Sequence, residues 1–137
     1  MKREHLQHMA DLRITEACHL MNGQSWSAAY YLLGYAVEFA LKSCISKQFA
    51  VETIPDKSLV NKIFTHDFDT LINLATLRLP LKQKVLSDPK FAASLSIGKE
   101  WTPDCRYAIW SEAATVQLHI AITHETYGVL PWIKMHW

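Results

Sequence analysis

The sequence has almost no excess of charge of either sign. Its 14 Lys and Arg residues balance 13 Asp and Glu residues, which gives a formal net charge of +1. A protein with so little net charge has no global field that draws it toward nucleic acid or an anionic membrane. Any contact with nucleic acid therefore requires a local patch of basic side chains.

Metal-binding and common cofactor motifs are also missing. The three cysteines, Cys18, Cys44 and Cys105, are widely separated and form no CxxC pair. They predict reduced, mostly buried thiols in a cytoplasmic protein. The sequence has no P-loop, no GxGxxG, no GxSxG and no pair of histidines with zinc-binding spacing. We therefore predict no metal site and no cofactor.

Signals for secretion and membrane insertion are absent as well. The charged start "MKREHLQHMADLR" is followed by no apolar run or cleavage site. Residues 28–45 approach the length of a membrane span, but Glu38 and Lys42 would each cost about 3 kcal/mol at a bilayer centre. This stretch predicts a buried helix in a bundle, with no membrane partner.

Strand-like alternation, internal repeats and low-complexity segments do not occur, whereas helical periodicity recurs along the chain. The 137 residues, 50% hydrophobic and 20% charged, suit one domain over 1–137. We predict an all-α, up-and-down bundle of four to five main helices with short extra helices. An amphipathic first helix over 2–21 precedes a second that ends near Gln48, and the second is apolar nearly all round, which predicts the central element.

Later segments predict shorter elements. A loop with a short helical piece precedes Phe64, and a short third helix follows, capped by Thr65. One or two short helices lie between residues 80 and 97, with Pro89 at a first helical position. A long last helix is predicted over 105–127, with Asp104 as its cap, Ile109 and Ile120 on its inward face and Thr115 on its outward face.

Glu38 and Lys42 are two charges inside an apolar helix, one turn apart. The order Glu then Lys at i and i+4 favours a helical ion pair. Because their neighbours leave little room for a polar face, we expect the pair to open into a notch. Two interpretations stay open, a purely structural pair and a contact for a ligand.

Four further residues predict a site for an anion. His66 and Asp67 stand where a loop becomes a helix, so they suit either capping or anion binding. Arg106 and Tyr107, at the predicted start of the last helix, suit a phosphate clamp, because Arg binds phosphate through two parallel hydrogen bonds. A salt bridge from Arg106 to Glu38 or Asp67 is the alternative. Trp101 predicts a core plug.

Several blocks in order, "YYLLGYAVEFALKSCI", "THDFDTLINLA", "EWTPDCRY" and "YGVLPWIKMHW", resemble the HEPN family of small helical domains, found in bacteria and beyond. The resemblance implies a helical bundle that forms a homodimer, binds a nucleotide or RNA, and often accompanies a nucleotidyltransferase in toxin–antitoxin or defence-type systems. Active members are metal-independent ribonucleases. The resemblance extends from residue 28 to the C-terminus.

The ribonuclease signature of the family is Arg, four to six residues, then His on a late helix. After Arg106 the corresponding window reads Ser111, Glu112 and Ala113, and the next histidine is His119. Three functions remain open. The first is a module that binds a nucleotide or RNA at a notch formed by Glu38, Lys42, His66, Asp67, Arg106 and Tyr107. The second is a ribonuclease with His66 as acid or base, and the third is a non-catalytic interaction protein that dimerises through its Trp-rich tail.

Overall fold

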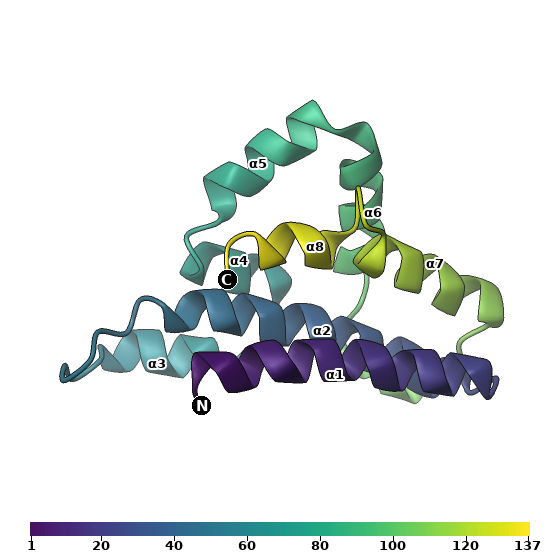
Figure 1. The fold of residues 1–137 in the computed structure, drawn as a ribbon, viewed down its shortest axis with the longest axis horizontal. Helices are drawn as coiled ribbons and strands as arrows, with labels where there is room; N and C mark the ends of the chain where they lie inside the picture. The colour runs from purple at the N-terminus through teal and green to yellow at the C-terminus, as the bar shows by residue number, and fades with distance from the viewer.

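The computed structural model describes residues 1–137, and the chain contains eight α-helices, one 3-10 turn and no strand (Figure 1). The elements are α1 (Arg3–Asn22), α2 (Trp26–Ser46), α3 (Lys57–Ile63), α4 (Phe68–Leu74), α5 (Arg78–Ser87), α6 (Pro89–Lys99), η1 (Pro103–Tyr107), α7 (Glu112–Thr123) and α8 (Val129–Lys134). Five helices have ten residues or more and three are shorter. The prediction of an all-α helical bundle is confirmed.

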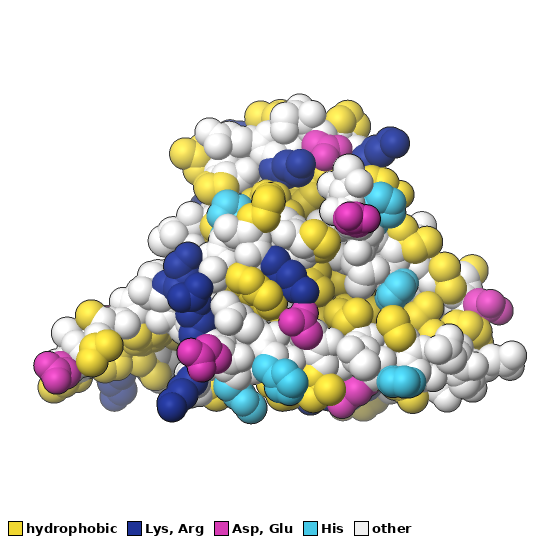
Figure 2. All heavy atoms as spheres, viewed as in Figure 1, with side chains coloured by type: hydrophobic (Ala, Val, Ile, Leu, Met, Phe, Trp, Pro, Cys, Tyr) yellow, Lys and Arg dark blue, Asp and Glu magenta, His cyan; other side chains and the backbone are white.

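Helix α2 is the central element, as its nearly uniform apolar surface predicted. It lies along α1 and also contacts α4, α7, α8 and η1 (Figure 1). One connected core of 26 buried residues includes residues from η1 and from every helix except α3. None of the helices is both long and apolar enough to cross a membrane. On the face drawn in Figure 2, acidic and basic side chains are both scattered among hydrophobic ones.

The cysteines are free thiols, and two of them are buried, as predicted. Cys44 and Cys105 lie in the core, and Cys18 is half-buried. Burial raises the pKa of the Cys44 and Cys105 thiols to about 11 each. Since the thiolate is the reactive form, these two cysteines act as small hydrophobic residues.

The prediction of one long last helix capped by Asp104 is wrong. Arg106 and Tyr107 lie in η1, after which Ala108 is extended, and Ser111 caps the separate helix α7. Two contacts of Trp110 explain the break. Its backbone N–H donates to the Ser27 hydroxyl at 2.8 Å, and its ring stacks on Tyr30 with 3.7 Å between centroids. Anchoring Trp110 on α2 requires a non-helical backbone there.

The predicted inward face of this helix is also wrong. Ile109 and Ile120 are exposed, whereas Thr115 is fully buried with Leu118 and Ile122. The Thr115 hydroxyl donates to the Ser111 carbonyl at 2.9 Å within its own helix and approaches the Trp26 carbonyl at 3.2 Å. A threonine whose hydroxyl is hydrogen-bonded can occupy a core position.

The chain between residues 64 and 99 follows the prediction with one change of cap. Asp67, rather than Thr65, caps α4, because its carboxylate accepts from the Thr70 backbone N–H at 2.7 Å. Two helices, α5 and α6, fill the stretch whose helix count was open. Pro89 occupies the first turn of α6, and Asp88 caps it by accepting from Phe91 N–H at 3.0 Å.

Trp101 is a core plug, as predicted, and it rests on a glycine. The indole is 8% exposed, and its N–H donates to the Tyr30 carbonyl at 3.1 Å. A Cβ built on Gly34 would lie 1.9 Å from the Trp101 ring. Only a residue without a side chain allows the indole to lie this close to α2. Trp101 therefore lies beside the polar groups described below.

We expect Gly34→Ala to destabilise the protein by about 1–3 kcal/mol, because the Trp101 ring must move out of its packed position. The matched control is Gly98→Ala. Gly98 is also helical, but its added Cβ would meet only Val129, at 3.7 Å, so that change should be neutral or stabilise by about 0.5–1 kcal/mol. Urea unfolding followed by circular dichroism measures both. Equal effects of the two changes would contradict the close approach of Trp101.

Candidate functional site

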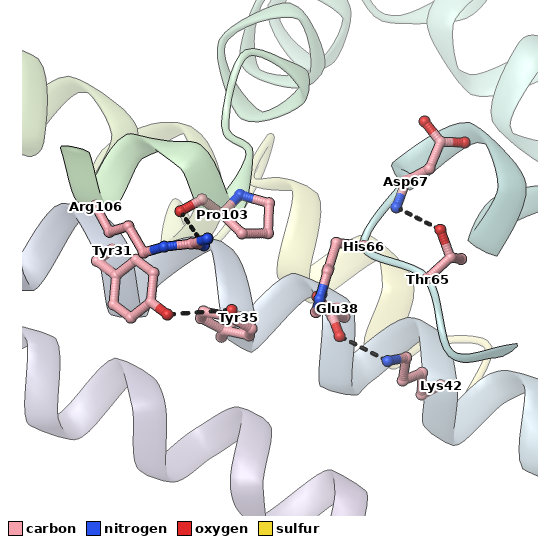
Figure 3. Close-up of polar contacts among 9 residues, drawn as sticks. All are labelled: Tyr31, Tyr35, Glu38, Lys42, Thr65, His66, Asp67, Pro103 and Arg106. Carbon is pink, nitrogen blue, oxygen red and sulfur yellow. Dashed lines mark hydrogen bonds and ion pairs between the residues drawn. The ribbon is translucent and has the colours of Figure 1, made fainter. Parts of the chain in front are cut away.

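A buried carboxylate on α2 joins two basic side chains. Glu38 has a side chain only 6% exposed. Its Oε1 accepts a hydrogen bond from Lys42 Nζ at 2.6 Å, and its Oε2 lies 2.7 Å from His66 Nδ1 (Figure 3). Removing a carboxylate from water is costly unless hydrogen-bonding partners satisfy it, and here the Lys42 ammonium and the His66 imidazole each satisfy one oxygen. The predicted Glu38–Lys42 pair is therefore present, and His66 joins it.

The contact with Glu38 fixes the orientation of the His66 ring. An ionised carboxylate only accepts hydrogen bonds, so Nδ1 must donate, and Nε2 is left without a protein partner. The His66 side chain is 52% exposed. It follows Phe64 and Thr65 in the loop that enters α4, and this loop is held by the Thr65 hydroxyl, which accepts from Asp67 N–H at 3.1 Å. His66 thus offers an oriented, solvent-facing nitrogen.

The hollow between Glu38 and His66 is too small for an organic ligand. It is lined by these two residues together with Gly34, Phe68 and Trp101, among others, and its volume is about 20 Å³. This space holds about one water molecule. A larger ligand of His66 must therefore lie outside the hollow, on the surface.

Two tyrosines of α2 continue from His66 along that surface. The Tyr35 ring meets the His66 ring edge-on, with 5.9 Å between centroids, and meets Trp101 at 5.0 Å. The Tyr35 hydroxyl is 3.3 Å from that of Tyr31, which lies one turn earlier. Burial is the main cause that raises the pKa of Tyr35, and the hydrogen bond with Tyr31 raises it further. This phenol therefore stays protonated.

Arg106 lies at the far end of the tyrosines (Figure 3). Its Nη1 donates to the Pro103 carbonyl at 2.9 Å, and its guanidinium lies over the Tyr107 ring, 4.5 Å from the centroid. The contact with the Tyr107 side chain raises the pKa of the guanidinium, so Arg106 is a permanent cation. We call Arg106, Tyr31, Tyr35 and His66 the Arg–Tyr–His row.

The structure brings together some of the predicted site residues and separates others. Glu38, Lys42 and His66 converge. Asp67 follows His66, but its carboxylate caps its own helix, and hydrogen bonds from Thr70 lower its pKa. Arg106 forms no salt bridge with Glu38 or Asp67, and its nearest carboxylate is Asp104 at 3.9 Å. Arg106 and Glu38 are connected only through the tyrosines.

Lys42 has a different environment from the one predicted. Its side chain is 10% exposed and paired with Glu38, so it is not presented to the surface where Arg106 lies. Sequence reasoning missed Tyr31 and Tyr35 as site residues. Their signal was the spacing, since residues 31, 35, 38 and 42 follow steps of four, three and four and so share one face of a helix.

Comparison with known proteins adds no identification. No family model, no curated protein and no solved structure matches this chain. The residues and geometry of this protein are therefore the basis for its proposed function.

We expect Glu38→Leu to cost about 3 kcal/mol of folding stability, because Lys42 is left as an unpaired buried cation. Adding Lys42→Met to that variant should recover most of the loss, since two apolar side chains then replace the pair. The control is Lys99→Met, which removes an exposed salt bridge to Asp69 of similar length, 2.7 Å, and should cost less than about 1 kcal/mol. Chemical denaturation of the wild type, these three variants and Lys42→Met alone tests this, and additive effects of the Glu38 and Lys42 changes would refute the buried coupling.

Proposed function

We propose that this protein is a HEPN-like domain that binds RNA or a nucleotide along the Arg–Tyr–His row. The observation that carries the proposal is the arrangement of Arg106, Tyr35 and His66, a permanent cation and an oriented imidazole on either side of aromatic rings. A phosphate needs cationic or N–H donors, and a base needs an aromatic face, so the row offers both kinds of contact.

Each residue of the row suits one part of such a ligand. Arg106 is only weakly paired, because its nearest carboxylate is 3.9 Å away, and its donors can turn toward a phosphate. Tyr107 is 79% exposed and already carries the guanidinium on one face of its ring, as in stacked Arg–aromatic sites for single-stranded nucleic acid. His66 Nε2 accepts from a ribose hydroxyl when the ring is neutral and donates to a phosphate oxygen when the ring is protonated. The small net charge of the chain agrees with a local contact of this kind.

The second candidate is a metal-independent endoribonuclease, and the contact between Glu38 and His66 favours it. A carboxylate that holds Nδ1–H leaves Nε2 as the base and stabilises the ring when it gains a proton. His66 would take the proton of a ribose 2′-hydroxyl, whose oxygen then attacks the adjacent phosphorus. The bond from phosphorus to the 5′-oxygen breaks, and the 5′-oxygen takes a proton from water, which gives a 2′,3′-cyclic phosphate and a 5′-hydroxyl. Arg106 would stabilise the charge that develops on the phosphate oxygens.

The proposal also includes association with other chains, because the HEPN resemblance implies a homodimer and a nucleotidyltransferase partner. The alternative of a pure interaction protein with a Trp-rich docking tail receives less support. Trp132 is 5% exposed, and Trp137 is half-buried under the ammonium of Lys134. These tryptophans are packed on the body of the domain rather than presented to a partner.

We expect short single-stranded RNA to raise the unfolding temperature of the protein by several degrees when it is present at one hundred times its dissociation constant, which corresponds to about 2.7 kcal/mol. Arg106→Ala should weaken RNA binding at least tenfold and reduce its salt dependence. The control is Arg3→Ala, which removes an exposed arginine from the start of α1. If both arginine variants bind RNA like the wild type, the row is not the binding surface.

A cleavage assay in the presence of a metal chelator separates the two candidates. If the protein is a ribonuclease, the wild type will cut RNA, and His66→Ala will lower the rate at least a hundredfold, as expected for loss of a general base. Glu38→Gln should also lower the rate but leave RNA affinity nearly unchanged. Intact RNA with the wild type, together with binding lost in Arg106→Ala, would establish the binding module instead.

A further inference from the structure

A mostly apolar hollow lies beside Lys42, one helical turn after Glu38. It has a volume of about 280 Å³, close to the lower end of the range for small-molecule pockets. Its lining residues come from the start of α1, the last turns of α2 and helix α3, together with residues that flank these helices. Seven of its nine lining residues are hydrophobic. We call it the α3 cavity.

The walls of the α3 cavity are aliphatic and aromatic from its base to its rim. Leu6 and Ile45 are buried at the base, whereas Met1 and Phe64 at the rim are more than 70% exposed. Helix α3 contributes Val60 and Ile63, which are only half-buried, and no residue of α3 is fully buried. The side of α3 that should pack on the bundle therefore faces open apolar space.

Lys42 is the charged group in this apolar wall. Its side chain is nine-tenths buried, and its ammonium donates to Glu38 and to no other protein group. An ammonium has three N–H donors, so two remain available. The other polar lining residue, Ser46, donates its hydroxyl to the Ser43 carbonyl at 2.6 Å. The polar head group of a ligand in the α3 cavity therefore contacts Lys42, and it must be a hydrogen-bond acceptor.

We propose that the α3 cavity binds a linear aliphatic carboxylate, with its chain along the walls of α1, α2 and α3 and its carboxylate on Lys42. An anion compensates the second and third donors of the ammonium without competing for Glu38, whose Oε2 stays with His66. A cationic head would meet Lys42 with like charge, and a neutral head would forgo the charge-assisted hydrogen bond. The proposal does not rest on the proposed RNA function, because none of the lining residues of the α3 cavity belongs to the Arg–Tyr–His row.

Titration calorimetry with octanoate, decanoate and dodecanoate below their micelle concentrations tests the proposal. Each added methylene should raise affinity about fourfold until the cavity is filled. Octanol should bind at least tenfold more weakly than octanoate, and octyltrimethylammonium should not bind detectably. Lys42→Met should weaken octanoate binding at least tenfold and leave octanol binding within a factor of two. Lys62→Met removes an exposed positive charge from α3, outside the lining of the cavity, and is the matched control.

A second variant keeps the test decisive if Lys42→Met does not fold. Val60→Trp fills the α3 cavity from the half-buried side of α3 and should abolish octanoate binding, whereas Asn61→Trp places the same ring at the exposed neighbouring position and should not. Circular dichroism checks that both variants are folded. The proposal is overturned if no alkyl carboxylate binds, if octanol binds as tightly as octanoate, or if Val60→Trp binds octanoate like the wild type.

Discussion

The polar side of this protein depends on one buried carboxylate. Glu38 lies on the central helix, where almost every neighbour is apolar, and it is tolerated there because Lys42 and His66 satisfy its two oxygens. The same contacts determine the position of the other groups. Lys42 is held inside the bundle, and the loop that enters α4 is tied to α2 through His66. A buried ion pair of this kind adds little net stability, but removing one partner is costly because the other charge is left buried and unpaired.

Glu38 also divides its surroundings into two sides with different chemistry. On the His66 side, Tyr35 and Tyr31 lead to Arg106, so the surface is aromatic and cationic (Figure 3). On the Lys42 side, the α3 cavity is aliphatic with one recessed ammonium. Both basic groups share one carboxylate, because Lys42 bonds its Oε1 and His66 bonds its Oε2. The two sides are thus electrostatically connected through a single side chain.

The sequence predicted those features that depend on local patterns. The apolar surface of α2 indicated its central place and predicted that Glu38 and Lys42 are not fully exposed, although it predicted a notch where the structure buries both side chains. Asp88–Pro89 marked the start of α6. The failures arise from contacts between distant segments. Trp110 stacks on Tyr30, and its backbone N–H donates to the Ser27 hydroxyl. These partners are about 80 residues earlier in the sequence, so the contacts that interrupt the helix after Arg106 cannot be predicted from the local pattern. Thr115 is buried for a similar reason, because part of its hydrogen bonding comes from Trp26 on another helix.

The break after η1 also bears on the ribonuclease signature that the HEPN resemblance implies. An Arg and a His with four to six residues between them can share a helix face only if the chain between them is helical. Here Ala108 is extended and α7 begins only at Glu112, so a histidine in the window after Arg106 would not lie on a helix with it. Any base paired with Arg106 must come from another segment. Of the seven histidines, His66 alone is hydrogen-bonded to a carboxylate, and it reaches the same surface from the loop before α4. The absence of the spacing motif therefore argues against an arginine and a histidine on one late helix. It does not argue against RNA cleavage by an arginine and a histidine from different segments.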